Sequence, residues 1–289
     1  MRRPTADRLK KAMWWDKAWS LVSGCVPVSD GCANCWAAEQ ADTRGYQESK
    51  TMQHRYGGLT LRTGNGVPYF NGEIRFMYKD LLKPFSQLTG RVFSIWTDLW
   101  HGTPEQIALA FATMMATQRH DYVICTKIPE RMLAFFEAYT PMDCWRYALE
   151  YHGPKFQRAC GRFTVDQVPA TWPLPNVIGM VTVESQEHVL KRLPHLIVTP
   201  FATRAIACEP LLGPVDFSQY GNAIDWVTAG CEVTRKSWLK RRADRDWFRH
   251  IAWQCDAFSI PLFLKQMEYC SRVAKLPPLD DVVYDQFPE

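Results

Sequence analysis

The chain has 289 residues, of which 47% are hydrophobic and 22% charged, and its formal net charge is +4. This length accommodates two small domains or one large α/β barrel, because such barrels commonly run to about 250 residues as a single unit. No apolar run approaches the roughly 20 residues of a membrane span, so we expect no transmembrane helix and no membrane partner, and the mild positive charge is compatible with a nucleotide or nucleic-acid substrate without arguing for one.

Residues 1–20 are expected to form a helical or irregular lead-in. Its bulky side chains Trp14, Trp15 and Trp19 suit the closure of a buried end of the fold. Residues 1–7 are basic, but no apolar signal core follows them, so we expect a cytoplasmic protein. In that compartment thiols stay reduced, and the ten cysteines are therefore not interpreted as a disulfide framework.

A short loop over residues 24–36 contains three cysteines: Cys25, Cys32 and Cys35. Its Pro, Gly and Ser-Asp residues oppose regular secondary structure, so we expect the loop to fold around a metal. Three thiolates favour a site with one open position, as in a 4Fe-4S cluster with one iron free for a ligand. Structural zinc would need a fourth ligand, for which His54 and Cys125 are the next candidates along the chain. Ordinary buried or free cysteines remain the other alternative, although two residues between Cys32 and Cys35 let both sulfurs face one metal.

The next segments are a predicted helix and a predicted irregular stretch. Residues 37–47 have a helical pattern, which places the cysteine loop before a helix N-terminus whose partial positive charge favours thiolates. Residues 50–72 are rich in Gly and Thr and are expected to form a loop or hairpin.

From residue 91 onward, short apolar runs alternate with helical patterns. The predicted strands are 91–97, 122–126, 177–183, 205–208, 226–230 and 261–264. The predicted helices are 104–117, capped by Thr103, then 129–139 and 244–258. Strands that are apolar on both faces indicate a parallel sheet covered on each side. We therefore expect an α/β fold, a partial or closed parallel βα barrel forming one domain over 1–289, with 268–289 as a C-terminal tail.

Charged or polar residues follow most of these strands, where a βα barrel places its active site. They are Asp98, His101, Lys127, Glu184, Glu209, Glu232 and Lys265. For each residue taken alone, the alternative is a solvated loop charge or a packed salt bridge. The basic run 235–242 is the best local candidate for phosphate contact, and a solvated helix face or loop is the alternative there.

Several sequence blocks look familiar when they are taken together. Besides the cysteine loop, they are Thr97-Asp98-Leu99-Trp100-His101, Thr126-Lys127-Ile128-Pro129-Glu130-Arg131-Met132, Val181-Thr182-Val183-Glu184, Cys208-Glu209-Pro210-Leu211-Leu212-Gly213-Pro214-Val215 and Ile224-Asp225-Trp226-Val227. They resemble a phage-associated three-cysteine protein family that is similar to radical SAM enzymes. The resemblance runs from about residue 19 to residue 266.

This resemblance implies a radical SAM-like barrel in which Cys25, Cys32 and Cys35 hold a 4Fe-4S cluster. The open iron would bind S-adenosylmethionine (SAM), and an external electron donor would supply the electron that releases a 5'-deoxyadenosyl radical. Trp36 lies where such proteins often have an aromatic side chain, and we expect it to pack beside the cluster. A phage-encoded protein would work in the host cytoplasm.

Two features depart from the familiar pattern. Six residues separate Cys25 from Cys32, rather than the three of the commonest radical SAM motif. The family also tends toward Gly-Gly-Glu-Ser-Gly after the fifth predicted strand, whereas this chain has Gly230-Cys231-Glu232-Val233-Thr234. Cys231 is therefore a fourth cluster ligand, a hydrogen-atom donor or an inert buried residue.

Strand-end position and resemblance together suggest roles for the polar residues. Glu184, Glu209 and Glu232 are expected to accept hydrogen bonds from the methionyl ammonium and the ribose of SAM. Lys127 and Lys265 suit the methionyl carboxylate or a substrate phosphate. Asp98 and His101 are candidates for substrate contact or proton transfer.

The substrate expected from the phage setting is a nucleotide or a DNA base. One reaction that needs radical chemistry is an isomerase-type rearrangement of an amino-acid-modified thymidine during phage DNA hypermodification. The competing interpretation is a non-catalytic metal-cluster protein that binds nucleic acid or a protein partner. A phosphate-binding βα barrel without metal is a third, and no Gly-rich phosphate motif of known form supports it.

Overall fold

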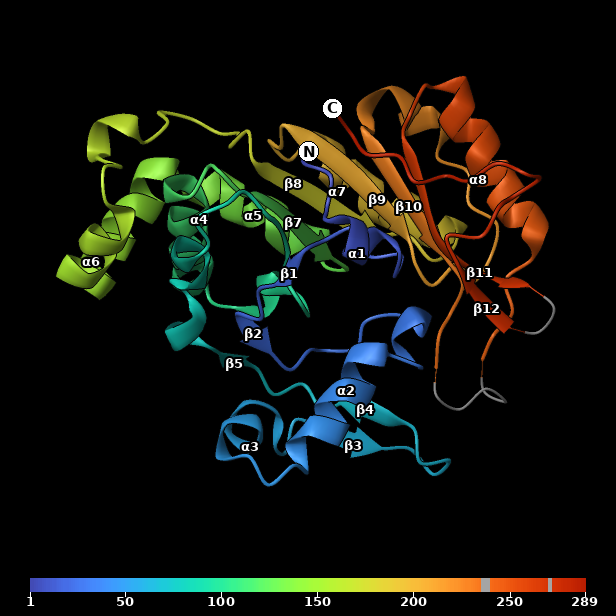
Figure 1. The fold of residues 1–289 in the computed structure, drawn as a ribbon, viewed down its shortest axis with the longest axis horizontal. Coiled ribbons are helices and arrows are strands. Elements are labelled where there is room, and N and C mark those ends of the chain that lie inside the picture. Colours follow the sequence, from blue (N-terminus) through green and yellow to red (C-terminus); the bar gives the residue numbers. More distant parts are fainter. Residues whose placement is uncertain (235–239, 270–271) are drawn as a thin grey trace.

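The centre of the computed structural model, which describes residues 1–234, 240–269 and 272–289, is one curled eight-stranded sheet (Figure 1). The strand order is β1-β6-β7-β8-β9-β10-β11-β12, and only the last pair, β11 and β12, is antiparallel. The strands are β1 (Lys17–Ala18), β6 (Val92–Ser94), β7 (Asp121–Thr126), β8 (Val177–Thr182), β9 (Thr203–Cys208), β10 (Trp226–Gly230), β11 (Leu262–Tyr269) and β12 (Arg272–Lys275). The order ends at β1 and β12 without pairing them, so the sheet is a half-barrel, the open form of the predicted βα barrel.

Side chains alternate between the two faces of this sheet, and each face has its own apolar cluster. On β7, Tyr122 and Ile124 face the outer cluster, whereas Val123 faces the inner one. Both faces are covered, which is why the strands read as continuous apolar runs.

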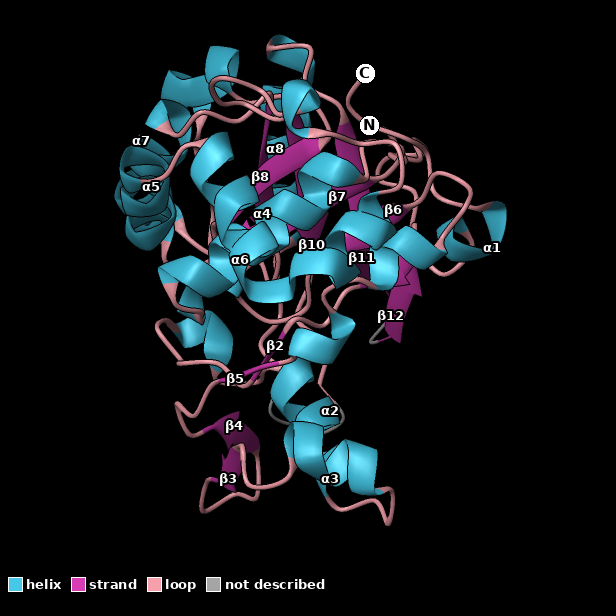
Figure 2. Ribbon diagram, turned by 90° about the vertical axis from the view of Figure 1, so that its left-hand side faces the viewer, coloured by secondary structure: helices cyan, strands magenta, loops and turns pink. Residues whose placement is uncertain are grey.

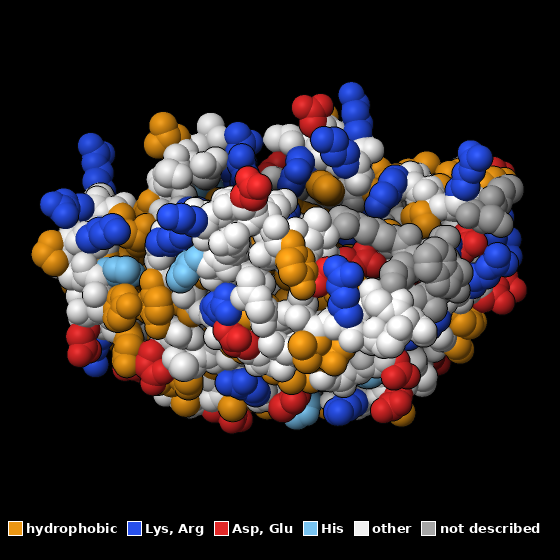
Figure 3. All heavy atoms as spheres, turned by 90° about the horizontal axis from the view of Figure 1, so that it is seen from below, with side chains coloured by type: hydrophobic (Ala, Val, Ile, Leu, Met, Phe, Trp, Pro, Cys, Tyr) orange, Lys and Arg blue, Asp and Glu red, His pale blue; other side chains and the backbone are white. Residues whose placement is uncertain are grey.

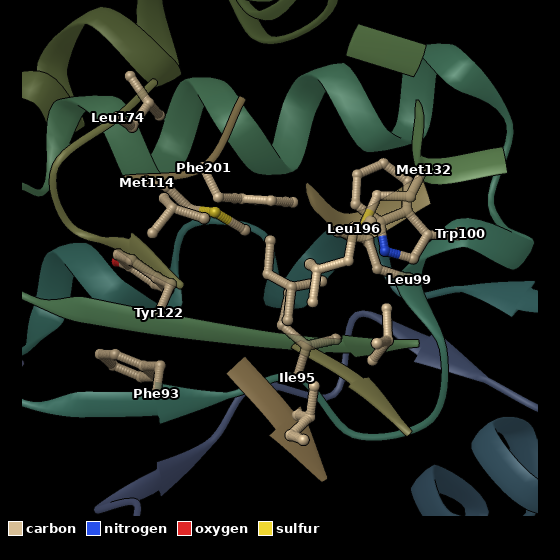
Figure 4. Close-up of a cluster of buried hydrophobic side chains, with 14 of the residues drawn as sticks. Phe93, Ile95, Leu99, Trp100, Met114, Tyr122, Met132, Leu174, Leu196 and Phe201 are labelled. Atoms are coloured by element: carbon tan, nitrogen blue, oxygen red, sulfur yellow. The ribbon is translucent and has the colours of Figure 1, made fainter. Parts of the chain in front are cut away.

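Helices cover the outer face (Figure 2). They are α4 (Pro104–Ala116), α5 (Pro129–Ala138), α6 (Pro141–Cys160), α7 (Gln186–Val198) and α8 (Arg245–Ala257). Thr103 and Gln106 form a capping box at the start of α4, which confirms the predicted cap. Figure 4 shows Trp100, Met132 and Leu196 gathered in the outer cluster, where Phe93 and Tyr122 also stack at 5.4 Å between ring centroids.

The inner face is filled by segments from both ends of the chain, which are irregular apart from the short helix α1 (Ala6–Leu9), whose Leu9 packs there. Trp14 and Trp15 lie in the inner cluster, and Phe287 packs against it. The ring of Trp14 meets that of Trp226 on β10 at 5.6 Å, edge to face. The N-terminal amine of Met1 donates to the carbonyl of Pro288 at 2.8 Å, so the two ends lie together (Figure 1).

A small layer hangs below the half-barrel (Figures 1 and 2). It consists of α2 (Trp36–Gly45), α3 (Lys50–Tyr56) and the hairpin β3 (Thr60–Arg62) and β4 (Pro68–Phe70), followed by β5 (Arg75–Phe76), which pairs with β2 (Val22–Ser23). These helices and the hairpin share a separate apolar cluster of Ala38, Ala41, Tyr56, Leu59 and Phe70. The cysteine loop leads directly into α2 and therefore lies between this layer and the sheet.

Three predictions about the elements need correction. Residues 50–72 begin with helix α3, and only their second half forms the predicted hairpin. Residues 1–20 contain the short helix α1 (Ala6–Leu9) and the edge strand β1, which pairs with β6. Residues 268–289, predicted to be a C-terminal tail, contain the end of β11 and the strand β12, and they pack on the inner face of the sheet. The other predicted strands and helices are confirmed within a few residues, whereas α6 and α7 were not predicted.

No helix within the described ranges combines the length and hydropathy needed to cross a bilayer.

Candidate functional site

The cysteine loop lies across the carboxyl ends of the parallel strands and is tied to several of them. After β8, Glu184 Oε1 accepts a hydrogen bond from Ser29 Oγ at 2.7 Å and forms an ion pair with Lys127, which follows β7. Gly31 sits directly on this pair: a Cβ there would stand 2.7 Å from Lys127 Nζ. Only a residue without a side chain allows the loop to approach so closely.

Glu184 is completely buried and is surrounded by donors. Its Oε2 accepts from Arg192 Nη1 at 2.6 Å and lies 3.2 Å from His188 Nδ1. Although burial opposes ionisation, Lys127 and Arg192 together hold the pKa of Glu184 at about 2. Among the described residues, Glu184 is not part of either cavity wall below, so in this structure it fixes the loop rather than facing open space.

A second tie joins the loop to the end of β10. Asn34 Nδ2 donates to Glu232 Oε2 at 2.9 Å. Glu232 also accepts the backbone N–H of Arg241 at 2.9 Å and forms an ion pair with its guanidinium. Burial opposes the charge on Glu232, but the bonds from Arg241 and Asn34 lower its pKa below the usual range.

A third tie joins the start of the loop to the segment after β6. His101 Nε2 accepts the backbone N–H of Val26 at 3.3 Å and lies 3.4 Å from Cys25 Sγ. Since a backbone N–H is always a donor, this contact makes Nε2 the acceptor nitrogen of a neutral ring. Burial lowers the pKa of His101, which favours the same neutral form.

Asp98 organises the turn from which His101 projects. It is buried and accepts hydrogen bonds from Thr126 Oγ1 at 2.7 Å, from the Lys127 backbone N–H at 3.0 Å and from that of Trp100 at 3.1 Å. Burial raises its pKa, and these donors and His101 oppose that rise. Asp98 thus links the ends of β6 and β7.

The three loop thiols line one cavity of about 210 Å³. Burial raises the pKa of Cys25 well above its usual range, with the Asp98 charge as the next cause, and burial also raises the pKa of Cys35. The fourth-thiol candidate Cys125 lines the same cavity from β7 and contacts Thr182 Oγ1 at 3.3 Å. In the described part of the chain, no three His, Cys, Asp or Glu side chains form a group that suits one metal ion.

A second cavity of about 590 Å³ adjoins the first. The two share a wall made by Trp15, Gly31, Cys35, Trp36, Trp96, Lys127, Glu209 and Lys265. Trp36 is 43% exposed, and its ring packs edge to face on that of Trp96 at 5.1 Å, so it forms a rim between the two spaces.

Glu209 and Lys265 form an ion pair in this shared wall in which only one of the two carboxylate oxygens has a hydrogen-bond donor. Lys265 Nζ donates to Glu209 Oε2 at 2.6 Å and lies 5.6 Å from the centre of the Trp15 ring. Glu209 Oε1 is buried and has no hydrogen-bond partner among the described residues. A buried carboxylate oxygen without a donor is costly, so a ligand donor is expected at this point.

Cys231 shares the wall of the second cavity with Cys35 but not with Cys25 or Cys32. It is buried, lines the second cavity and not the first, and burial raises its pKa to about 11. Its backbone N–H and carbonyl pair with Gln266 at 3.1 and 3.0 Å.

The predicted phosphate-contact run 235–242 is described only in part, because 235–239 lie outside the described residues. Its remaining cations face carboxylates: Lys240 lies 2.8 Å and Arg242 3.6 Å from Glu268, and Arg241 pairs with Glu232. On the lower face of the molecule, basic and acidic side chains are interspersed rather than gathered in one block (Figure 3).

The predicted site residues thus gather at one edge of the sheet. Both cavity walls together contain Asp98, His101, Lys127, Glu209, Glu232, Lys265, Trp36 and the three loop cysteines. Five further wall residues had no role in the site predicted from the sequence: Arg8, Trp15, Arg44, Trp96 and Lys275. Trp15 lies in the lead-in and Trp96 within the predicted strand 91–97, and the bulk of both side chains was a signal, whereas the three cations had none.

Comparison with known proteins identifies the family of this chain but no individual protein that matches it. No curated protein matches the chain, and no solved structure does. The model of the family described as "Protein of unknown function (DUF5131)" matches residues 10–288. Because the match spans nearly the whole sequence, the chain belongs to the DUF5131 family.

Proposed function

We propose that this protein is an iron-sulfur radical SAM enzyme whose cluster is held by Cys25, Cys32 and Cys35. The observation that carries the proposal is the placement of these three thiols in one cavity wall at the carboxyl ends of a parallel half-barrel. Active sites of βα barrels are built at that edge.

The donor chemistry of the site fits this group. Burial disfavours the thiolates of Cys25 and Cys35, so a cationic centre would supply the charge that stabilises them. Cysteine thiolates are the usual ligands of iron-sulfur clusters, so Cys25, Cys32 and Cys35 would hold this group. The unpartnered Glu209 Oε1 in the adjoining wall offers an acceptor for an ammonium or hydroxyl group of SAM.

When bound and reduced, the cluster and SAM supply a 5'-deoxyadenosyl radical that abstracts a hydrogen atom from the substrate. The protein's own residues would hold the cysteine loop in place and shield the adjoining cavity. Ser29, Asn34 and Val26 fix the loop, and His101 supports Cys25. Trp15, Trp36 and Trp96 line the adjoining space and give it an apolar wall that would help to shield a bound radical from water.

The substrate that we propose is a nucleotide or a DNA base, and the reaction is a rearrangement of an amino-acid-modified thymidine in phage DNA hypermodification. Aromatic walls beside cationic side chains, as in the second cavity, are the usual surroundings of bound bases.

The first experiment measures iron and sulfide after anaerobic reconstitution, and then 5'-deoxyadenosine after addition of dithionite and SAM. We expect both in the wild type and neither in a Cys25→Ser/Cys32→Ser/Cys35→Ser variant. Cys160→Ala is the matched control, because Cys160 is buried on α6 away from both cavity walls.

Each outcome separates the candidate functions. Iron with no 5'-deoxyadenosine would favour the non-catalytic metal-cluster protein. Wild-type protein that takes up no iron would overturn both. For the substrate, reduced enzyme is incubated with SAM and phage DNA, and an unchanged nucleoside profile by mass spectrometry would contradict the thymidine reaction.

A further inference from the structure

We propose that the second cavity binds an oxyanion of the substrate between Arg8 and Lys275, with the rest of the ligand lying toward Trp36 and Trp96. This assignment deepens the proposed function by naming a substrate group, but the binding itself requires neither cluster nor SAM.

The charge of the cavity wall is the first support. Five basic residues line it: Arg8, Arg44, Lys127, Lys265 and Lys275. Two acidic residues, Glu209 and Glu232, line it as well. The nearest charges cancel in pairs, Lys265 with Glu209, Lys127 with Glu184 and Glu232 with Arg241.

Three cations are left without a carboxylate within the described ranges. Arg8 Nε donates to the Trp15 carbonyl at 3.1 Å, and Lys275 Nζ to the Gln266 side chain at 2.8 Å. Arg44 donates to the Tyr56 hydroxyl at 3.4 Å. All three partners are neutral, so positive charge in this wall is not compensated. Cations that converge on a cavity in this way are suited to an anionic ligand.

Two cations of the cavity wall, one of them unpaired, gather around one indole. Trp15 receives the Arg8 hydrogen bond at its carbonyl and has the Lys265 ammonium 5.6 Å from its ring centre. Lys275 lies opposite Gln266 in the β11–β12 pairing, next to Lys265. The partial burial of Lys275 and, after it, the nearby charge of Lys265 lower the pKa of Lys275, which an anion would reverse. The anion subsite is therefore at the open edge of the sheet, between the lead-in and β12.

The remaining wall is suited to a planar group. Trp36 and Trp96 meet edge to face, and the Arg44 guanidinium lies 5.4 Å from the Trp96 ring centre. Trp36 is exposed and Trp96 is half-buried, and accessible indole faces beside an arginine stack readily on flat rings. An oxyanion at Arg8 and Lys275, joined to a planar ring at Trp36, describes a nucleotide phosphate. The carboxylate of an amino-acid substituent is the other source of the same oxyanion chemistry.

Isothermal titration calorimetry of the full-length protein tests the assignment. The probes are thymidine 5'-monophosphate, thymidine, glutamate and SAM. We expect the monophosphate to bind about tenfold or more tightly than thymidine, the difference made by one charge-assisted contact. If glutamate binds instead and the monophosphate does not, the oxyanion is a carboxylate and the subsite stands.

Variants locate the binding. Arg8→Gln/Lys275→Gln should weaken binding of the anionic probe about tenfold or more and leave thymidine unchanged. Trp36→Ala should weaken thymidine and its monophosphate alike. Lys191→Gln, an exposed lysine on α7 outside both walls, is the control and should behave as wild type. Circular dichroism checks that each variant is folded.

Three results would overturn the subsite: no binding of either anion, equal binding of anions by wild type and double variant, or displacement of the anion by SAM. The last result would assign these cations to the cofactor. Repeating the titration with the triple cysteine variant separates the two proposals, because anion binding should persist there even if no cluster forms.

Discussion

At the scale of single residues, Glu184 is the buried charge on which the site depends. It has no exposed surface, yet Lys127, Arg192 and Ser29 all direct positive charge or a donor at its two oxygens. A buried carboxylate is tolerable only with such compensation, and the loss of either side leaves an unpaired charge. In this structure both oxygens of Glu184 are therefore occupied in holding the loop to the sheet.

Glu184→Gln should destabilise the protein at pH 7 by about 3 kcal/mol. Because the folded pKa of about 2 lies below the ordinary value of 4.5, the charge stabilises the fold fully above pH 4.5. That stabilisation is lost as the pH falls from 4.5 toward 2. Urea unfolding at pH 7, 4 and 3 should show the difference between wild type and variant shrinking as the pH falls. Glu130→Gln, an exposed residue on α5, is the control.

A pH-independent difference between wild type and Glu184→Gln would contradict the low folded pKa. No difference at any pH would mean that the ion pairs around Glu184 contribute nothing to stability.

Gly31→Ala tests the close approach of the loop to the same ion pair. The added Cβ would lie 2.7 Å from Lys127 Nζ and even closer to Glu184 Oε1, which its other partners prevent from yielding. We expect a loss of about 1–3 kcal/mol in the unfolding free energy. Gly64→Ala is the matched control, since a Cβ there meets nothing within 4 Å. Equal urea midpoints for the two variants would show that the loop is not packed as described.

At the scale of elements, the cysteine loop has little regular structure of its own and is shaped by bonds to strand ends. Ser29 and Asn34 reach β8 and β10, while Val26 reaches the segment after β6. Each acceptor is separated from its donor by 75 to 198 residues in the chain. The loop geometry is thus a property of the assembled sheet.

Ser29→Ala/Asn34→Ala keeps the three thiols but removes two charge-assisted bonds that hold them. We expect the reconstituted variant to lose iron to a chelator about tenfold faster than wild type or more, because each of the two bonds is worth about 1.5–3 kcal/mol. Asn222→Ala, at an exposed position of a short 3-10 helix, is the control. Iron-loss rates equal to wild type would mean that the thiols alone determine retention.

The sequence was sufficient to predict that polar residues at the strand ends lie near one another, but not which of them form ion pairs. Periodicity marked the parallel strands and hence the edge at which Asp98, Lys127 and Glu209 would gather. It does not encode which carboxylate meets which cation, so Glu184 and Glu209 appeared equivalent although one is saturated by partners and the other is not. The helix α3 was missed because Gly and Thr near residue 60 dominated the composition of that window.

At the scale of the whole molecule, the inner face of the half-barrel is closed by two distant parts of the chain. Trp14 and Trp15 come from the lead-in and Phe287 from the last segment, and both pack on the same strands. Neither segment shows periodicity, since irregular chain fills the space. This is why neither segment was assigned to the inner face: the lead-in was expected to close a buried end of the fold and residues 268–289 to form a tail, whereas the parallel sheet itself was predicted correctly.

Phe287→Ala should lower the stability of the entire fold. The ring lies 5.4 Å from that of Phe263 and 5.8 Å from that of Trp226, so its removal opens the inner cluster. We expect a loss of about 2 kcal/mol and a fall in Tm of several degrees, read by differential scanning calorimetry. Val283→Ala, at a side chain that is 53% exposed, should stay within about 0.5 kcal/mol of wild type. An unchanged Tm for Phe287→Ala would show that the C-terminal segment does not stabilise the sheet.

The first cavity owes its room to small side chains on the sheet, and Ala207 of β9 is one of them. Its methyl group is the whole of what that position contributes to the wall, and it carries no charge. The capacity of the site can therefore be altered at this position by a leucine, which would fill part of the 210 Å³ while every ion pair around it stays in place. The volume of the cavity and the charge of its wall are therefore set by different residues, so substitutions during evolution can change one without changing the other.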